Sequence, residues 1–169
     1  MDFFSRGEYS QRITWNICNH WGKFNAEGGV RLFKNTITHL AEDTGLEVEA
    51  LHGEPGVYSA RYAGVNATSE ENIEKLLFAL DKIKNRKARF KTVITFQTTE
   101  KVMQFEGIIS GEITEIRRGG NGFGYDSVFI PAGFDHTFAE MESAQKQELS
   151  HRQRAFVKFL SHLSQCINN

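Results

Sequence analysis

The sequence predicts an α/β fold with a mixed, antiparallel-rich central sheet and flanking helices. Two alternating apolar segments with a short connection, residues 88–98 and 102–110, are typical of a β-hairpin. Two other segments, after Thr68 and after Ser150, place apolar residues about 3.6 residues apart, as amphipathic helices do. Because strands and helices are interspersed along 169 residues, we expect one domain spanning residues 1–169.

The composition excludes several classes of partner. Apolar residues make up 40% and charged residues 24% of the chain, which is typical of globular proteins. The net charge of −1 gives no basic surface for nucleic acid, and no apolar run reaches the length of a membrane span. The cysteines, Cys18 and Cys166, have neither metal-site nor disulfide-scaffold spacing, and the N-terminus has no signal-peptide pattern. We therefore expect a cytoplasmic protein without nucleic-acid or membrane partners.

The first third of the chain gives the least regular pattern. Residues 11–18 are consistent with a short strand, and residues 30–40 with a strand or a helix. Leu46, Val48 and Ala50 then alternate with acidic residues, which favours a half-buried strand over a helical turn. The Gly- and Pro-containing residues 52–56 predict a turn.

Clearer signals follow from residue 68 onward. Thr68 and Glu71 form a capping-box pattern that predicts the start of a helix. The apolar positions of this helix are Ile73, Leu76, Leu77, Leu80 and Ile83. The predicted hairpin places four alternating residues on one face of its first strand: Phe90, Thr92, Ile94 and Phe96.

The C-terminal part is predicted to add two strands and a helix. Residues 112–117 and 128–131 are the strand candidates. The last helix is expected to start near Ser150, with Gln153 as a capping partner. Its apolar stripe consists of Ala155, Phe156, Phe159, Leu160, Leu163 and Ile167.

The first candidate for chemistry is the acidic pair Glu42 and Asp43, which precedes Thr44 and Gly45. Adjacent residues of a strand point in opposite directions, so one acid can face a metal while the other faces the structure. Carboxylate oxygens suit Mg²⁺, which uses few protein ligands beside substrate phosphates. The alternative is a solvated acidic turn.

The second candidate is Arg61, which lies between Tyr58 and Tyr62 among small residues. Its guanidinium can bind phosphate oxygens. The alternative is that Arg61 packs on the tyrosine rings.

Residues 119–126, Gly-Gly-Asn-Gly-Phe-Gly-Tyr-Asp, combine glycines with an aromatic ring and an acid. Glycines allow a ligand to approach the backbone closely, Phe123 offers a flat face, and Asp126 offers acceptor oxygens to ring N–H groups. This pattern suggests a nucleobase pocket. A glycine-rich hairpin with a structural aromatic residue is the alternative.

Lys146, His151 and Arg152 gather near the expected start of the last helix. Such a cationic group suits an oxo group or a phosphate, whereas the alternative is a capped surface helix with basic side chains. Together the segments provide acids for a metal, a platform for a base and cations. A nucleotide hydrolase needs these parts.

Residues 41–64, 119–131 and 146–152 resemble the three signatures of the inosine/xanthosine triphosphate pyrophosphatase family, in the same order. The resemblance extends from about Ala41 to the C-terminus, roughly three quarters of the chain. It implies that the chain hydrolyses noncanonical purine nucleoside triphosphates (ITP, dITP and XTP) to the monophosphate and pyrophosphate. It also implies the cofactor Mg²⁺ and a homodimer.

The resemblance assigns a role to each matching residue. Asp43 would be the catalytic acid at the metal, with Glu42 as its metal-binding partner. Recognition of the 6-oxo group and adjacent atoms would come from Lys146, His151 and Arg152. The other substrate-binding residues would be Thr44, Gly45, Gly122, Phe123, Gly124, Tyr125 and Asp126.

Two positions depart from the family pattern. Ser127 stands where the family usually has proline after Tyr-Asp, which should have little effect. Residues 1–40 contain no clean copy of the family's Ser/Thr-x-Asn-x-x-Lys phosphate-binding turn, and residues 18–23 are the nearest match. Because this segment is atypical, the alternatives are a catalytically impaired purine-nucleotide-binding remnant and a poorly folded product of a disrupted gene.

Overall fold

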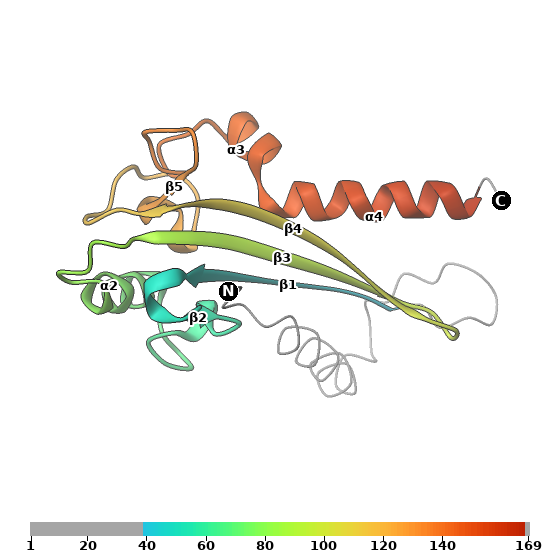
Figure 1. Ribbon diagram of the computed structural model, residues 1–169, viewed down its shortest axis with the longest axis horizontal. Helices are drawn as coiled ribbons and strands as arrows, with labels where there is room; N and C mark the ends of the chain where they lie inside the picture. Colours follow the sequence, from blue (N-terminus) through green and yellow to red (C-terminus); the bar gives the residue numbers. More distant parts are fainter. Residues whose placement is uncertain (1–38, 168–169) are drawn as a thin grey trace.

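The computed structural model describes residues 39–167 and shows a five-stranded sheet with helices beside it (Figure 1). The strands are β1 (His39–Val48), β2 (Pro55–Gly56), β3 (Lys87–Gln97), β4 (Val102–Ile113) and β5 (Phe129–Pro131). Their order is β2-β1-β3-β4-β5, and every pair is antiparallel. This arrangement confirms the predicted α/β fold. The predictions for residues 11–18 and 30–38 lie outside the described residues.

Within residues 39–167, three α-helices and three short 3-10 helices accompany the sheet. The α-helices are α2 (Ser69–Ala79), α3 (Ser143–Leu149) and α4 (His151–Ile167), and the 3-10 helices are η2 (Glu49–Leu51), η3 (Ser59–Arg61) and η4 (Gly124–Val128). In Figure 1, α4 runs beside β3 and β4, while α2 lies near the start of β3. Between residues 39 and 167, no helix combines the length and the apolar character needed to cross a membrane.

Strand β1 confirms the strand predicted around Leu46 and Val48, whose side chains are fully buried, but the expected alternation of burial fails, because Glu47 between them is also buried, as an ion pair with Arg89. Ala50 lies just beyond it in η2. The turn predicted for residues 52–56 is present, and its last two residues, Pro55 and Gly56, pair with β1 as β2.

Helix α2 begins at the predicted capping box. The Glu71 backbone N–H donates to Thr68 Oγ1 at 3.2 Å, and the Thr68 N–H donates to Glu71 Oε2 at 2.7 Å. The helix ends at Ala79, so the prediction that Ile83 belongs to it is wrong. Ile83 still packs against the core, because the chain turns back there toward β3.

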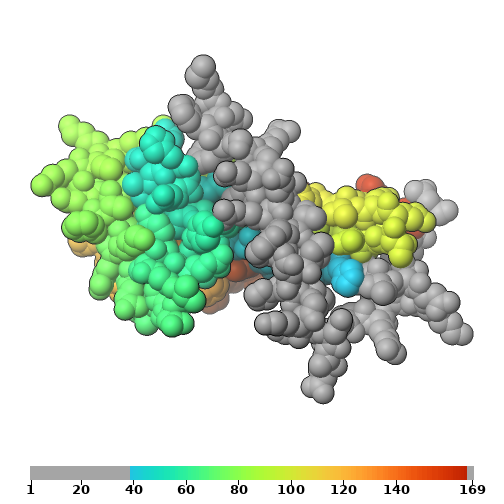
Figure 2. Space-filling model, turned by 90° about the horizontal axis from the view of Figure 1, so that it is seen from below, coloured from blue at the N-terminus to red at the C-terminus, as the bar shows by residue number. Residues whose placement is uncertain are grey.

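The predicted hairpin is confirmed by β3 and β4, which project at one end of the molecule (Figure 2). One face of β3 contributes to two apolar clusters. Phe90 belongs to the larger core with Leu46 and Leu76, while Ile94 belongs to a smaller cluster under α4. Thr92 lies between them and is fully buried.

The strand predicted for residues 112–117 is wrong, although β5 confirms the strand predicted at residues 128–131. Only Glu112 and Ile113 are extended, as the end of β4. The Thr114 hydroxyl donates to the Ile116 carbonyl at 2.7 Å, and the Arg86 guanidinium donates to the carbonyls of Ile113 and Thr114. These bonds bend the chain away from the sheet.

The expected last helix is α4, but a separate helix, α3, precedes it. Ser150 separates the two with an extended backbone. Its hydroxyl accepts the Gln153 N–H at 3.1 Å, which confirms the predicted helix start. Lys146 therefore lies on a different helix from His151 and Arg152.

Helix α4 approaches the sheet closely at Gly107 of β4. A Cβ atom at this position would lie 1.9 Å from the His151 carbonyl oxygen and 2.5 Å from the Ala155 nitrogen. Only glycine leaves room for this backbone contact.

We predict that Gly107→Ala lowers the free energy of unfolding by about 1–3 kcal/mol, because the added methyl group must push α4 off the sheet. Gly120→Ala is the matched control, since a Cβ there has no neighbour within 4 Å. Urea unfolding measures both variants. Equal midpoints for the two would contradict the close packing at Gly107.

Candidate active site

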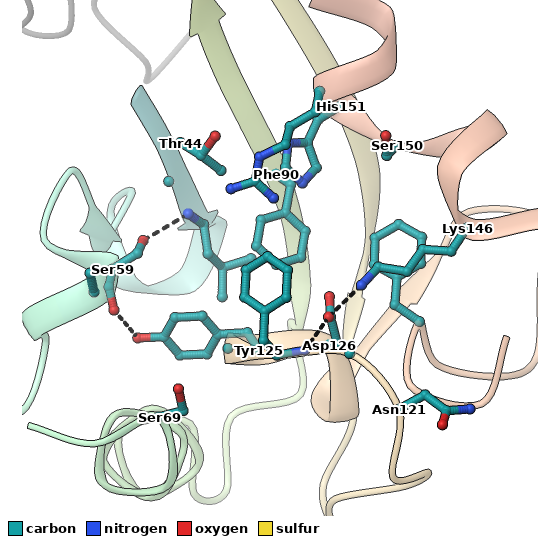
Figure 3. Close-up of a pocket in the computed structure, with 18 of the residues that line it drawn as sticks. Thr44, Ser59, Ser69, Phe90, Asn121, Tyr125, Asp126, Lys146, Ser150 and His151 are labelled. Atoms are coloured by element: carbon teal, nitrogen blue, oxygen red, sulfur yellow. Dashed lines mark hydrogen bonds and ion pairs between the residues drawn. The ribbon is translucent and has the colours of Figure 1, made fainter. Parts of the chain in front are cut away.

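A cavity of about 580 Å³ opens where β1, the glycine-rich segment and the α3–α4 junction meet (Figure 3). All ten residues predicted to bind substrate line this one cavity, although they come from segments far apart in the sequence. They are Thr44, Gly45, Gly122, Phe123, Gly124, Tyr125, Asp126, Lys146, His151 and Arg152. The fold therefore brings together the three sequence segments that we singled out.

Asp126 organises the glycine-rich segment. Its Oδ2 atom accepts the Phe123 backbone N–H at 2.7 Å and the Lys146 ammonium at 2.5 Å (Figure 3). A Cβ at Gly122 would lie 2.2 Å from the same oxygen, and Gly122 has a φ of +83°. Glycine is required there for both reasons. Asp126 thus holds the turn and Lys146 in place.

Phe123 is the exposed aromatic residue of the cavity. Its side chain is 67% exposed, and two cations lie near its ring. Lys146 Nζ lies 5.2 Å and Arg152 Cζ 5.4 Å from the ring centroid. A ring held in this way offers a flat surface next to hydrogen-bond donors, which suits a planar base with an oxo group.

Tyr125 forms a wall of the cavity. Its hydroxyl donates to the Ser59 carbonyl at 2.9 Å, and the Ser59 hydroxyl accepts the Leu46 N–H at 2.8 Å (Figure 3). Burial raises the pKa of Tyr125, so its hydroxyl remains protonated and remains a donor. These bonds fix the loop around Ser59 to β1.

His151 lies in the first turn of α4, stacked on Phe90 with ring centroids 5.0 Å apart. Its Nδ1 atom lies 2.6 Å from Thr92 Oγ1, and Thr92 Oγ1 lies 2.6 Å from Thr44 Oγ1. Burial, together with the nearby charges of Arg152 and Lys146, lowers the pKa of His151 to about 3. His151 is therefore neutral at physiological pH, unlike the cation expected from the sequence.

The acidic pair divides between the two faces of β1. Glu42 Oε1 accepts Arg152 Nε at 2.7 Å and the Thr44 hydroxyl at 3.2 Å. Asp43 points to the opposite face and does not line the cavity. Burial raises the pKa of Asp43, a hydrogen bond with the Thr44 backbone and the Arg61 charge lower it, and the Glu42 charge raises it.

Arg61 packs on a tyrosine ring, which was the alternative to phosphate binding. Its guanidinium carbon lies 5.0 Å from the centroid of the Tyr58 ring, and Arg61 is not among the residues that line the cavity. Packing on an aromatic ring therefore accounts for its position between tyrosines.

Several cavity or near-cavity residues were not predicted as site residues, among them Ser59, Phe90 and Thr92. Thr92 carried a usable signal, because it is the one polar residue on an otherwise apolar strand face. Ser59 and Phe90 gave no such signal, since serine in a loop and phenylalanine in a strand are common.

A multidentate metal site is absent from the part of the chain that the structure describes, where no three His, Cys, Asp or Glu side chains gather. Mg²⁺ often binds one or two carboxylates and completes its shell with water and phosphate oxygens. The Asp43 carboxyl fits that limited role, whereas Glu42 already has Arg152 and Thr44 as partners.

The fold and the cavity define an α/β domain with a site for a planar, polar ligand. The chain belongs to the Ham1 family, whose family model matches residues 23–162. That match begins earlier than the resemblance seen from about Ala41 onward.

Named relatives share the same region. The chain is 52% identical over 125 residues to the dITP/XTP pyrophosphatase of Flavobacterium johnsoniae, covering 74% of this chain and 65% of the relative. It is 53% identical to that of Christiangramia forsetii, covering 74% of this chain and 66% of the relative. The chain thus spans slightly less than two thirds of these relatives.

Solved structures agree with the fold. The Staphylococcus aureus Ham1 protein superposes with a TM-score of 0.73 at 45% identity, covering 75% of this chain and 67% of that chain. A nucleoside-triphosphatase / dITP/XTP pyrophosphatase from Mycobacterium abscessus gives a TM-score of 0.67 at 38% identity, covering 73% of this chain and 67% of that chain.

We predict that His151 makes stability depend on pH. Its pKa is lower in the folded state, about 3, than its ordinary value of 6.5, so only the unfolded chain gains a proton as the pH falls through this range. The stability contributed by the neutral ring is fully present above pH 6.5 and is lost progressively as the pH falls below 6.5. The wild type should therefore lose more stability than His151→Gln between about pH 7 and pH 5. If the urea midpoints of the wild type and His151→Gln fall by the same amount between these two pH values, the prediction is contradicted.

Proposed function

We propose that the chain hydrolyses noncanonical purine nucleoside triphosphates, ITP, dITP and XTP, to the monophosphate and pyrophosphate. The observation that carries this proposal is the convergence of all ten predicted binding residues on one cavity. The printed names of the relatives, dITP/XTP pyrophosphatase, support the same substrate class.

The cavity supports recognition of a purine with a 6-oxo group. Phe123 provides the stacking surface, and Lys146 and Arg152 provide only hydrogen-bond donors near it. A 6-oxo group accepts hydrogen bonds, whereas the 6-amino group of adenine donates them. A site built on such bonds discriminates strongly between the two.

Asp43 is the group that we propose for catalysis. It is adjacent to the cavity-lining Thr44 and partly buried, and burial is the main cause of its raised pKa. Perturbed carboxyl groups of this kind are common at functional sites. In the proposed role, Asp43 orients and deprotonates the water that attacks the triphosphate.

We also propose Mg²⁺ as the cofactor, held by Asp43 together with the substrate phosphates. Bound Mg²⁺ neutralises phosphate charge and orients the leaving pyrophosphate. The role of Glu42 in metal binding stays a prediction. Its ion pair with Arg152 gives it a second role, because Arg152 is proposed to contact the base.

The resemblance to the family is the support for a homodimer in the cytoplasm, which we propose as the working state. Sedimentation velocity of the purified chain measures its mass directly. A species of monomer mass at all concentrations would contradict the dimer.

We predict that the purified chain releases pyrophosphate from ITP at least about a hundredfold faster than from ATP, and only with Mg²⁺ present. A coupled pyrophosphate assay checks this. ITP binding without turnover would instead favour the catalytically impaired binding remnant.

Asp43→Asn should lower kcat by about 10²–10⁴-fold while the protein remains folded, because the amide cannot accept the water's proton. Asp81→Asn is the matched control, since Asp81 is an exposed carboxylate that pairs with the exposed Lys82 ammonium at 3.7 Å. Equal rates for both variants would remove Asp43 from the mechanism.

A further inference from the structure

A chain of hydroxyl groups connects Glu42 to His151 through the sheet. Thr44 and Thr92 are direct partners in the β1–β3 register, and their Oγ1 atoms lie 2.6 Å apart. Thr92 Oγ1 also lies 2.6 Å from His151 Nδ1, and Thr44 Oγ1 lies 3.2 Å from Glu42 Oε1. Thr92 is fully buried, so water does not reach this chain at its centre.

The carboxylate at one end fixes the direction of every bond in the chain. A carboxylate only accepts hydrogen bonds, so the single hydroxyl hydrogen of Thr44 points to Glu42. Thr44 Oγ1 must then accept the hydrogen of Thr92. Because Thr92 has no second hydrogen, its oxygen accepts from His151 Nδ1–H.

The other ring nitrogen of His151, Nε2, is consequently a hydrogen-bond acceptor in the neutral ring. The residue is only 6% exposed and lines the cavity. Within residues 39–167, no side chain or backbone group forms a hydrogen bond with Nε2. A buried acceptor without a partner is costly, so a donor on the bound ligand would satisfy it.

We propose, on the basis of the proposed function, that the Glu42–Thr44–Thr92 chain holds His151 as an acceptor for a purine ring N–H beside the 6-oxo group. Thr92 is then a positioning residue for substrate specificity. Hypoxanthine and xanthine carry a hydrogen on N1 next to the 6-oxo group, while adenine has a lone pair on N1. Lys146 and Arg152 therefore recognise the acceptor of the base, and His151 recognises its neighbouring donor.

This assignment revises the view that three cations surround the oxo group. A neutral His151 with Nε2 unprotonated repels both the oxo group and N1 of adenine. Rejection of adenine then has two sources, the cations at position 6 and the acceptor at position 1.

The test is ¹⁵N NMR of histidine-labelled full-length chain at neutral pH, which distinguishes protonated from unprotonated ring nitrogens. We expect His151 to show a protonated Nδ1 and an unprotonated Nε2, with the signals assigned by their loss in His151→Gln. Thr92→Val removes the hydroxyl and should abolish this single tautomer, whereas Thr92→Ser keeps the hydroxyl and should restore it. A protonated Nε2 in the wild type, or an unchanged tautomer in Thr92→Val, would overturn the proposal.

A second readout tests the ligand. IMP should shift the Nε2 signal upfield, and AMP should not. An unshifted Nε2 signal at IMP concentrations that saturate the protein, as measured by calorimetry, would overturn the role in base recognition. Thr92→Val should also reduce the preference for ITP over ATP in kcat/KM by about tenfold, with Thr92→Ser near the wild type.

These measurements separate the inference from the proposed function. The tautomer of His151 is read in the free protein and does not require turnover. If no pyrophosphate is released while the tautomer and the Nε2 shift are as expected, the hydrolysis proposal fails and the assignment of His151 stands.

Discussion

The contact between the first turn of α4 and the sheet at Gly107 positions the α4 side of the cavity. Gly107 faces Thr92 in the β3–β4 register, and its missing side chain leaves room for the His151 backbone. This close approach allows a 2.6 Å bond between the His151 ring and Thr92. It also sets the position of Arg152, and with it the distance to Glu42 and Phe123. The positions of His151 and Arg152 in the cavity therefore depend on how tightly α4 packs on the sheet.

The polar atoms of the site lie between two apolar clusters, and this location explains why their side chains have fixed conformations. Phe90 belongs to the larger core and Ile94 to the cluster under α4, with Thr92 between them on the same strand face. A buried hydroxyl in such a place is stable only when its hydrogen bonds are satisfied. Thr44 and His151 provide those bonds, so the packing of both clusters restricts their side chains.

Local patterns in the sequence predicted those elements of the fold whose pattern lies within a single helix or strand. The capping box at Thr68 and the alternation through Phe90 needed no tertiary information. The separate helix α3 was missed because its seven residues are too few to show an apolar stripe. The site residues were identified by type, yet the neutral state of His151 depends on burial and on charges brought from Lys146 and Arg152. His151 lies four residues before Ala155 of the predicted apolar stripe, but that spacing alone does not show how deeply its ring is buried.

The ion pair between Glu42 and Arg152 joins residues that are 110 positions apart in the chain. Contacts of such long sequence separation form late, because the intervening chain must first lose its conformational freedom. During synthesis, the strand that carries Glu42 leaves the ribosome well before α4 does. The proposed nucleotide site is therefore completed among the last events of folding, and a nascent chain that has built its sheet still lacks Lys146, His151 and Arg152, the cavity residues proposed to select the base.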